Sequence, residues 1–261
     1  MKVKLYQIDA FTDKMFSGNP AAVCILDKLL DQKIMQKIAA ENNLAETAFV
    51  VKKDKDFEIR WFTPSVEVDL CGHATLASAY VLYEYYDYQF DKIKFHSIAS
   101  GILTVRREND FLTLNFPTDN YKKIDIPQIF IDAFGLEPIE AYKGKTDYLL
   151  IFPNQKDIEK FKPDLDLIKT AGGRGVIVSA KGNETDFVSR FFGPQVGINE
   201  DPVTGSAHTT LTPIWAKKLN KNMLTAKQLS KRQGDLKCKY LGDRVEISGK
   251  AVTYLIGEID I

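Results

Sequence analysis

The sequence predicts an α+β fold that is internally duplicated into two lobes, each a mainly antiparallel sheet or barrel wrapped around a central helix. Three observations predict it. Strand-like runs, rich in β-branched and aromatic residues that often alternate with polar ones, dominate the 261 residues. Two helical segments, 74–86 and 207–219, are apolar or small around most of their circumference, which is typical of a helix buried on all sides. A seven-residue motif also recurs at half the chain length.

The repeated motif is Arg-Trp-Phe-Thr-Pro-Ser-Val at 60–66 and Arg-Phe-Phe-Gly-Pro-Gln-Val at 190–196. Four positions are identical, and the offset of 130 residues (190 minus 60) is half of 261. Each copy is followed by an acidic residue and then by a glycine that opens one of the two apolar helices: Asp69 and Gly72, then Asp201 and Gly205. A duplication accounts for all of these features. It predicts an N-terminal lobe over 1–120, to which a strand at about 250–261 returns, and a C-terminal lobe over 121–249.

The other elements follow from local patterns. An amphipathic helix is predicted over 31–42, where Ile34, Met35, Ile38 and Ala39 recur at three- and four-residue spacings. Shorter helices are predicted over 128–134, 165–171 and 225–232. Strands are predicted over Val3–Ile8, Ala48–Val51, Phe57–Phe62, Leu103–Arg106, Leu112–Phe116, Tyr148–Phe152, Gly175–Val178, Asp186–Phe192, Arg244–Ser248 and Val252–Ile259.

Composition excludes several classes of protein. The 35 basic and 35 acidic side chains give no net charge, which argues against a dedicated nucleic-acid binder. No run approaches the roughly 20 apolar residues of a membrane span, and the first residues read as a strand rather than a signal peptide. Three scattered cysteines without C-x-x-C spacing predict neither a disulfide framework nor a zinc site. We therefore expect a cytoplasmic protein without a metal.

Two segments at the starts of the apolar helices carry candidate site residues. His73 follows Gly72, and the positive end of a helix favours its neutral form; a structural histidine is the alternative. Asp201 lies in Glu-Asp-Pro-Val-Thr-Gly-Ser-Ala-His, where it or Thr204 could equally cap a helix that begins at Ser206. Because helix starts present free N–H groups, two of them facing each other would suit a carboxylate ligand.

Glu46 and Asn19 lie in two further segments. Glu46 is placed between a helix and an apolar strand, where partial desolvation would raise its pKa toward the range useful for proton transfer; an ordinary solvated glutamate is the alternative. Asn19 belongs to Phe-Ser-Gly-Asn-Pro, a turn signal that leads into a strand-like run and that also has a purely structural interpretation.

The two halves differ in their chemistry. At about the repeat offset, Arg174 takes the place of Glu46, and Thr204 takes that of Cys71. A racemase with paired thiol bases needs an acid or base on each face of its substrate, and here the second thiol is missing. One principal carboxylate, assisted by a histidine and an aspartate, fits the sequence better.

Four motifs together resemble one family. Phe-x-Gly-Asn-Pro, Asn-Leu-Ala-Glu-Thr-Ala-Phe, Asp-Leu-Cys-Gly-His-Ala-Thr and Glu-Asp-Pro-Val-Thr-Gly-Ser-Ala-His, in this order, resemble the PhzF-like phenazine-biosynthesis family, which shares the duplicated fold of diaminopimelate epimerase. The resemblance extends from Gln7 to near the C-terminus. It implies an active site between the lobes, isomerase chemistry without metal or organic cofactor, and a homodimer.

The resemblance also implies roles for individual residues. The glutamate that moves a proton between two carbons matches Glu46, and the assisting residues match His73 and Asp201. Backbone amides at Gly72 and Gly205, with Ser206, would hold the substrate carboxylate; Asn19 joins this binding set. Ala45 departs from the small hydroxyl residue expected beside the glutamate of the phenazine enzyme, which affects the choice of substrate more than the mechanism.

The sequence thus predicts a cofactor-independent isomerase or epimerase of a small carboxylic acid, phenazine-biosynthesis-like in type. Its partners would be that substrate and a second copy of the chain, with neither nucleic acid nor membrane. Two alternatives stay open. One is a two-base racemase that uses Cys71 with Glu46 or Asp201, and the other is a non-catalytic carboxylate-binding protein that retains the family cleft.

Overall fold

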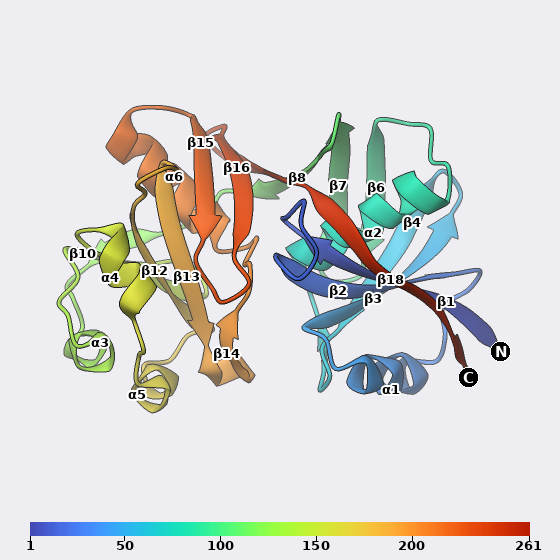
Figure 1. Cartoon of the computed structure of the whole chain (residues 1–261), viewed down its shortest axis with the longest axis horizontal. Helices are drawn as coiled ribbons and strands as arrows, with labels where there is room; N and C mark the ends of the chain where they lie inside the picture. The colour runs from blue at the N-terminus through green and yellow to red at the C-terminus, as the bar shows by residue number, and fades with distance from the viewer. The chain divides into compact units, whose positions relative to one another are not determined.

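The computed structural model describes residues 1–261 and divides them into two units (Figure 1). Unit 1 comprises Met1–Asn115 and Ser248–Ile261, and unit 2 comprises Phe116–Ile247. Strands β8 (Phe111–Pro117) and β17 (Arg244–Gly249) carry the chain across these two divisions. No helix is long and apolar enough to cross a membrane.

Unit 1 wraps its strands around one buried helix, α2 (Gly72–Tyr85), which packs against β1, β2, β3, β7 and β18 (Figure 1). Ten residues of α2 are buried, including all of Gly72–Ala79, as its apolar circumference predicted. The other elements are β1 (Lys2–Ala10), β2 (Asn19–Leu26), α1 (Gln32–Asn42), β3 (Glu46–Lys53), β4 (Asp56–Phe62), β5 (Glu67–Val68), β6 (Lys92–Ser97), β7 (Gly101–Glu108) and β18 (Ala251–Asp260).

The C-terminal strand β18 pairs antiparallel with β1 along its whole length. The two ends of the chain consequently meet within unit 1, where the N–H of Ile261 donates to the carbonyl of Met1 at 2.9 Å (Figure 1). On the outer face, α1 packs through Met35, Ile38 and Ala39 on apolar side chains of β1, β2 and β3.

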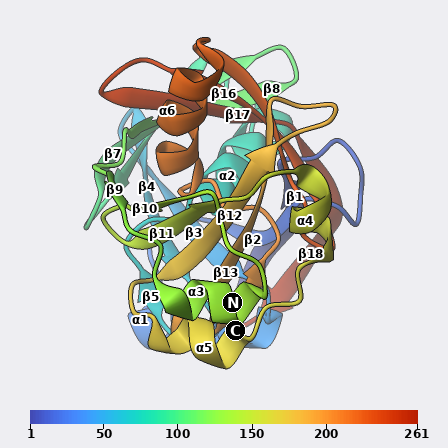
Figure 2. The ribbon, with the colours of Figure 1, turned by 90° about the vertical axis from the view of Figure 1, so that its left-hand side faces the viewer.

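Unit 2 places its helices on both faces of a sheet. On one face of β12 (Gly175–Lys181), Ser179 accepts a hydrogen bond at 2.9 Å from Trp215 of the buried helix α6 (His208–Leu219). On the other face, the neighbouring residues Val178 and Ala180 belong to a core that also contains residues of α3, α4 and α5. Figure 2 shows these helices. This alternation is what a strand buried on both faces requires. The elements are β9 (Lys122–Ile124), α3 (Gln128–Phe134), β10 (Glu140–Lys143), β11 (Asp147–Ile151), α4 (Gln155–Lys160), α5 (Leu165–Thr170), β12 (Gly175–Lys181), β13 (Phe187–Gly193), the 3₁₀ turn η1 (Pro194–Val196), β14 (Ile198–Asp201), β15 (Met223–Gln228) and β16 (Gly234–Tyr240).

The two units repeat one topology. In unit 1, β2 runs parallel to β3, β3 antiparallel to β4, β4 parallel to β6, and β6 antiparallel to β7. Unit 2 repeats this order of pairings: β11 runs parallel to β12, β12 antiparallel to β13, β13 parallel to β15, and β15 antiparallel to β16. The buried helix enters at the same place in each series, before β6 and before β15. The structure is therefore internally duplicated, as the repeated motif predicted.

The repeated arginine makes the same contacts in both units. Arg60 pairs with Glu67 and lies 5.3 Å from the ring centre of Phe62. Arg190 pairs with Glu200 and lies 4.9 Å from the ring centre of Phe192. The motif thus encodes an ion pair stacked on an aromatic ring, which is a structural role.

Two expectations about local structure were wrong. The segment 225–232 begins within strand β15, where burial alternates between Leu224, Ala226 and Gln228 and their exposed or half-buried neighbours. Pairing with β13 and β16 supplies its backbone hydrogen bonds, and this outweighs its weak helical pattern. The second glycine, Gly205, also does not open a helix, since residues 205–207 form a turn and α6 begins at His208.

Candidate active site

His73 and Glu46 form the centre of the candidate site in unit 1. Nε2 of His73 lies 3.2 Å from a carboxylate oxygen of Glu46. Glu46 is the first residue of β3 and His73 the second residue of α2, so two elements converge on this contact. The side chains are 12% and 6% exposed, and Glu46 is therefore not the solvated glutamate of the alternative interpretation.

The other ring nitrogen of His73 is held from a third direction. The side-chain amide of Asn19, the first residue of β2, lies 3.2 Å from Nδ1, and Sγ of Cys71 lies 3.5 Å from the same atom. Asn19 is fully buried. An amide that donates to Nδ1 leaves the ring hydrogen on Nε2, so the neutral tautomer points its N–H toward Glu46.

Burial lowers the pKa of His73 from 6.5 to about 3. The sequence predicted a neutral imidazole, with the helix start as its cause; the structure gives desolvation by burial as the cause. A neutral imidazole can donate one hydrogen bond and accept another, which suits a group that orients a substrate beside a carboxylate.

The residue that ends α1, Asn43, directs the backbone toward Glu46. Asn43 ends α1 in the left-handed conformation at φ 49°, and its N–H donates to the carbonyl of Ala39. This terminates the helix as an αL cap does and turns the backbone toward β3. Because β3 is parallel to β2, with Glu46 opposite Ala21, the first residues of both strands lie at one sheet end.

In unit 2, Asp201 and Thr204 are fixed by a buried glutamine. Oγ1 of Thr204 donates to the carboxylate of Asp201 at 2.5 Å. Gln228 on β15, fully buried, accepts from the N–H of Thr204 at 2.9 Å and donates to the carbonyl of Asp201 at 2.8 Å. The side chain of Gln228 thus holds the backbone at both Asp201 and Thr204, and this fixes the position of the Asp201 carboxylate.

Neither Asp201 nor Thr204 caps the helix, contrary to the capping alternative. The residue before α6 is Ala207, which makes no side-chain cap, and the helix starts at His208. Nδ1 of His208 lies 2.9 Å from the carbonyl of Thr204, and burial lowers the pKa of His208 to about 4. His208 is thus a neutral core histidine that fastens the loop to the helix.

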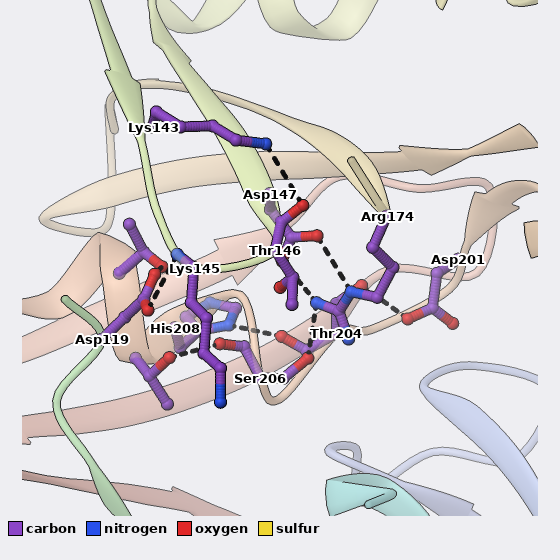
Figure 3. Close-up of polar contacts among 12 residues, drawn as sticks. Asp119, Lys143, Lys145, Thr146, Asp147, Arg174, Asp201, Thr204, Ser206 and His208 are labelled. Atoms are coloured by element: carbon purple, nitrogen blue, oxygen red, sulfur yellow. Dashed lines mark hydrogen bonds and ion pairs between the residues drawn. The ribbon is translucent and has the colours of Figure 1, made fainter. Parts of the chain in front are cut away.

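Arg174 joins Ser206 to a buried carboxylate (Figure 3). Its guanidinium donates through Nε and Nη2 to both carboxylate oxygens of Asp147, which is 4% exposed, and Nη2 also donates to Oγ of Ser206 at 3.0 Å. The side chain lies beside Asp201, whose charge adds to the attraction that raises the pKa of Arg174 against its burial (Figure 3). The geometry is that of a bidentate arginine–carboxylate pair.

Sequence reasoning assigned no site role to Arg174, Asp147 or Gln228. Arg174 was noted only as the counterpart of Glu46 in the second half. Arg174 contacts Ser206 across 32 positions, Gln228 contacts Thr204 across 24, and Asp147 contacts Arg174 across 27. No local sequence pattern could reveal partners at these separations. In unit 1, by contrast, Glu46, His73 and Asn19 were all singled out, and the structure brings these three together.

One group of side chains also has the composition of a metal site. Ligand atoms of Glu46, Cys71 and His73 all lie within 4.8 Å of one another. The absence of C-x-x-C spacing had argued against such a group in the sequence.

Comparisons with known proteins agree with this architecture. Residues 8–257 match the model of a family described as phenazine biosynthesis-like protein. An uncharacterized isomerase of Pseudomonas aeruginosa is 49% identical over 100% of both chains. The crystal structure of a PhzF-family protein from Enterococcus faecalis superposes with a TM-score of 0.97 at 44% identity, with 100% of both chains covered. A hydroxyproline epimerase from Agrobacterium vitis, at 11% identity and a TM-score of 0.66, shares the fold over 99% of this chain and 92% of its own.

Proposed function

The chain belongs to the phenazine biosynthesis-like (PhzF) family and is an isomerase, and we propose that it moves a proton between carbons of a small carboxylic acid with Glu46 as the proton carrier. Glu46 would take a proton from an allylic or α-acidic carbon and return it elsewhere on the same face of the substrate. No cofactor takes part in this step.

The contact between Glu46 and His73 supports the proposal most strongly. A carboxylate that is largely buried and 3.2 Å from a neutral imidazole is placed as a general base with a neighbouring hydrogen-bond donor. General acid–base assistance of this kind is typically worth about 10²–10⁴-fold in rate. Once Glu46 has taken up the proton, the Nε2–H of His73 would be free to donate to the substrate group on which charge develops, which is the role of an oxyanion-type donor.

The remaining residues would bind and orient the substrate. We assign Asp201 to a hydrogen bond with a polar group of the substrate, and the backbone amides of Gly72 and Gly205 together with the Ser206 hydroxyl to its carboxylate. Asn19 would act by fixing the ring of His73. A homodimer, a cytoplasmic location and a biosynthetic role complete the proposal, and they rest on the family resemblance.

Exchange of carbon-bound hydrogen with solvent tests the reaction directly. The enzyme is incubated with candidate carboxylic acids in D₂O, and proton NMR follows the loss of signal at individual carbons. A turned-over substrate gains deuterium at the carbon that receives the returned proton, since Glu46 would exchange with solvent. A complete absence of isomerisation and exchange over a broad panel of such acids would count against the proposal.

Glu46→Gln tests the assignment of the base. The amide keeps the size of the side chain and removes the basic oxygen, so turnover should fall by at least about 10²-fold while the melting temperature changes little. Glu41→Gln on the exposed face of α1 is the matched control and should retain full activity. Wild-type rates in Glu46→Gln would reject Glu46 as the proton carrier.

A second mechanism is favoured by the position of Cys71, whose Sγ lies 3.5 Å from Nδ1 of His73. In this mechanism the thiol and a carboxylate act on opposite faces of the substrate, as in a two-base racemase. It predicts that Cys71→Ser abolishes turnover and that either enantiomer gains deuterium. Under the single-carboxylate mechanism, Cys71→Ser retains activity.

A further inference from the structure

Arg174, which directly precedes β12, is held in one orientation. Its backbone N–H donates to the carbonyl of Thr146 at 2.8 Å, and its guanidinium pairs with both carboxylate oxygens of Asp147. The guanidinium also lies 5.2 Å from the ring centre of Phe191 on β13. A side chain fixed in this way presents its donor atoms in a defined direction, which is the condition for a residue that orients a neighbour.

The hydrogen bond from Arg174 determines how the Ser206 hydroxyl can act. Nη2 of Arg174 is a donor without acceptor capacity, so Oγ of Ser206 accepts at 3.0 Å. A serine hydroxyl has one hydrogen, and Oγ of Ser206 donates it to no other group of the chain. The hydroxyl is thus kept as a donor, and its charged partner strengthens it because hydrogen-bonded groups polarise one another.

Further donors lie next to this hydroxyl. The N–H groups of Ser206 and Ala207 precede α6, and neither donates to a carbonyl of the chain. Nη1 of Arg174 likewise makes no hydrogen bond within the chain. Because all of these groups are donors, the ligand that suits them offers acceptors only, as an ionised carboxylate does.

The charge of Arg174 has a second effect at this position. The charges of three carboxylates, Asp147, Asp201 and Asp119, act on the guanidinium. Without a cation among them, these carboxylates would repel an anionic ligand at Ser206. Arg174 offsets that repulsion for an anion, whereas an uncharged ligand does not need the cation.

We propose that Arg174 is a positioning and specificity-determining residue of the isomerase. It directs the Ser206 hydroxyl toward the substrate carboxylate and makes the site select the ionised acid over an uncharged analogue. The inference rests on the proposed function, which places the carboxylate at Ser206 and gives the proton transfer to Glu46. Since Arg174 acts on binding, its loss should raise KM more than it lowers kcat.

Two matched probes test the selection without a substrate. Full-length ¹⁵N-labelled protein is titrated with acetate and with acetamide at constant ionic strength. Shifts of the Ser206 and Ala207 amide signals and of the Arg174 Nε–H signal give the two dissociation constants. In the wild type, acetate should bind at least about tenfold more tightly, a ratio typical of one charge-assisted hydrogen bond. Equal affinities for the two probes would overturn the proposal.

Two variants of Arg174 separate its charge from its packing, and the amide spectrum of each variant checks folding. Arg174→Gln removes the cation, so the preference for acetate should fall about tenfold while acetamide affinity changes by less than about twofold. Arg174→Lys keeps the charge and should restore most of the preference. An unchanged preference in Arg174→Gln would refute the role of the cation.

Arg60→Gln in unit 1 is the matched control for the loss of an arginine pair. Arg60 also forms a bidentate pair with a carboxylate, that of Glu67, and its guanidinium lies 5.3 Å from an aromatic ring centre. This variant should keep the wild-type preference for acetate. A preference lost equally in Arg60→Gln and Arg174→Gln would show a general structural effect and contradict the proposal.

Ser206→Ala tests the orientation of the hydroxyl without the loss of an ion pair. It should weaken acetate binding about fivefold or more. Arg174→Gln should then cost less in the Ser206→Ala background than in the wild type, since both changes act through one contact. Strictly additive losses would refute the claim that Arg174 acts through Ser206.

The outcomes also separate this inference from the proposed function. If acetate binds equally well to wild type and to Arg174→Gln, the carboxylate site stands and the role of Arg174 is wrong. If acetate shifts neither the Ser206 nor the Ala207 amide in the wild type, the proposed placement of the carboxylate is wrong, and the role of Arg174 with it. With a substrate found by deuterium exchange, Arg174→Lys should raise KM several-fold and keep kcat within about twofold; a fall in kcat alone would contradict a binding role.

Discussion

Arg174 donates a hydrogen bond to Ser206 at 3.0 Å, and this pair occupies the position in unit 2 that Glu46 and His73 occupy in unit 1. Arg174 directly precedes β12 as Glu46 begins β3, and Ser206 follows Gly205 as His73 follows Gly72. The two backbone positions are the same in both units, but the side chains at them differ in chemical type. Arginine and serine offer no carboxylate there, so the proton carrier that we propose, Glu46, has no counterpart at this position in unit 2.

Replacement of Arg174 by glutamine should destabilise unit 2. The change leaves the buried carboxylate of Asp147 without both of its charge-assisted hydrogen bonds. Loss of one partner of a buried pair costs about 3–5 kcal/mol, and the partial exposure of Arg174 lowers the expected loss to about 2–3 kcal/mol. Urea unfolding of Arg174→Gln measures this change in the free energy of unfolding.

The double variant with Asp147→Asn distinguishes a pair interaction from a loss of packing. If the unpaired carboxylate causes the loss, the double variant should be more stable than the sum of the two single changes predicts. Arg106→Gln, a surface arginine that is 44% exposed and pairs with Glu108, should change the free energy by less than about 1 kcal/mol. Strictly additive losses would contradict the buried-pair interpretation.

Asn19→Ala should lower turnover while the fold is retained. The variant removes the side chain that holds Nδ1 of His73, so the ring loses its fixed tautomer and orientation beside Glu46. A misplaced group near the reacting atoms costs about 10²-fold in rate, and we expect a fall in kcat of that order. Asn109→Ala, at an exposed turn, is the control; equal rates in wild type and Asn19→Ala would show that Asn19 is structural.

Acid should destabilise the protein through its buried histidines, and His208 allows the sign to be tested. Its pKa is about 4 in the folded chain against 6.5 ordinarily, so between these values the unfolded chain holds a proton that the folded chain lacks. Stability therefore falls as pH is lowered from about 6.5 to about 4, by about 1.4 kcal/mol per pH unit near pH 5 for one histidine.

His208→Asn isolates this contribution. An asparagine amide can still donate to the carbonyl of Thr204, in place of Nδ1, but it does not titrate. Denaturant unfolding from pH 7 to pH 4.5 should show a shallower loss of stability in the variant. Parallel curves for the two proteins would mean that His208 binds its proton as readily in the folded chain as in the unfolded chain.

The sequence predicted the elements whose burial follows a local period. The helix over Gln128–Phe134 has the predicted bounds, because it ends at Gly135, which takes the left-handed conformation of a helix C-cap. The two apolar helices were found because a chain segment without a polar face can only be buried. The bounds and the burial of these helices depend on residues that are close in sequence, within one or two helical turns.

Features that depend on distant partners could not be predicted in this way. Gln228 is a polar residue that is fully buried, and its hydrogen bonds go to the backbone at Asp201 and Thr204 and to the Thr204 hydroxyl. Its strand was accordingly taken for a helix. In the candidate site, Glu46 and His73 were singled out from local patterns and given roles by the family resemblance, whereas their contact arises from the pairing of β2 with β3 and the placement of α2.

Gly18 should be intolerant of a side chain because of one backbone contact. It adopts φ +66°, and a Cβ there would lie 2.2 Å from the carbonyl oxygen of Ala10. Gly101 adopts nearly the same φ, +68°, but a Cβ there meets nothing within 4 Å. Gly101→Ala should thus cost only the roughly 1–2 kcal/mol of a left-handed backbone.

Gly18→Ala should cost at least about 2 kcal/mol more than Gly101→Ala, since strand ends must move to relieve the contact. Denaturant unfolding of both variants measures the difference, and it isolates the contact because the backbone strain is common to both. Because Gly18 directly precedes Asn19, the displaced strand end should also carry Asn19 away from His73 and reduce turnover. Equal stability losses at the two glycines would refute the steric explanation and leave backbone conformation as the sole reason for glycine at position 18.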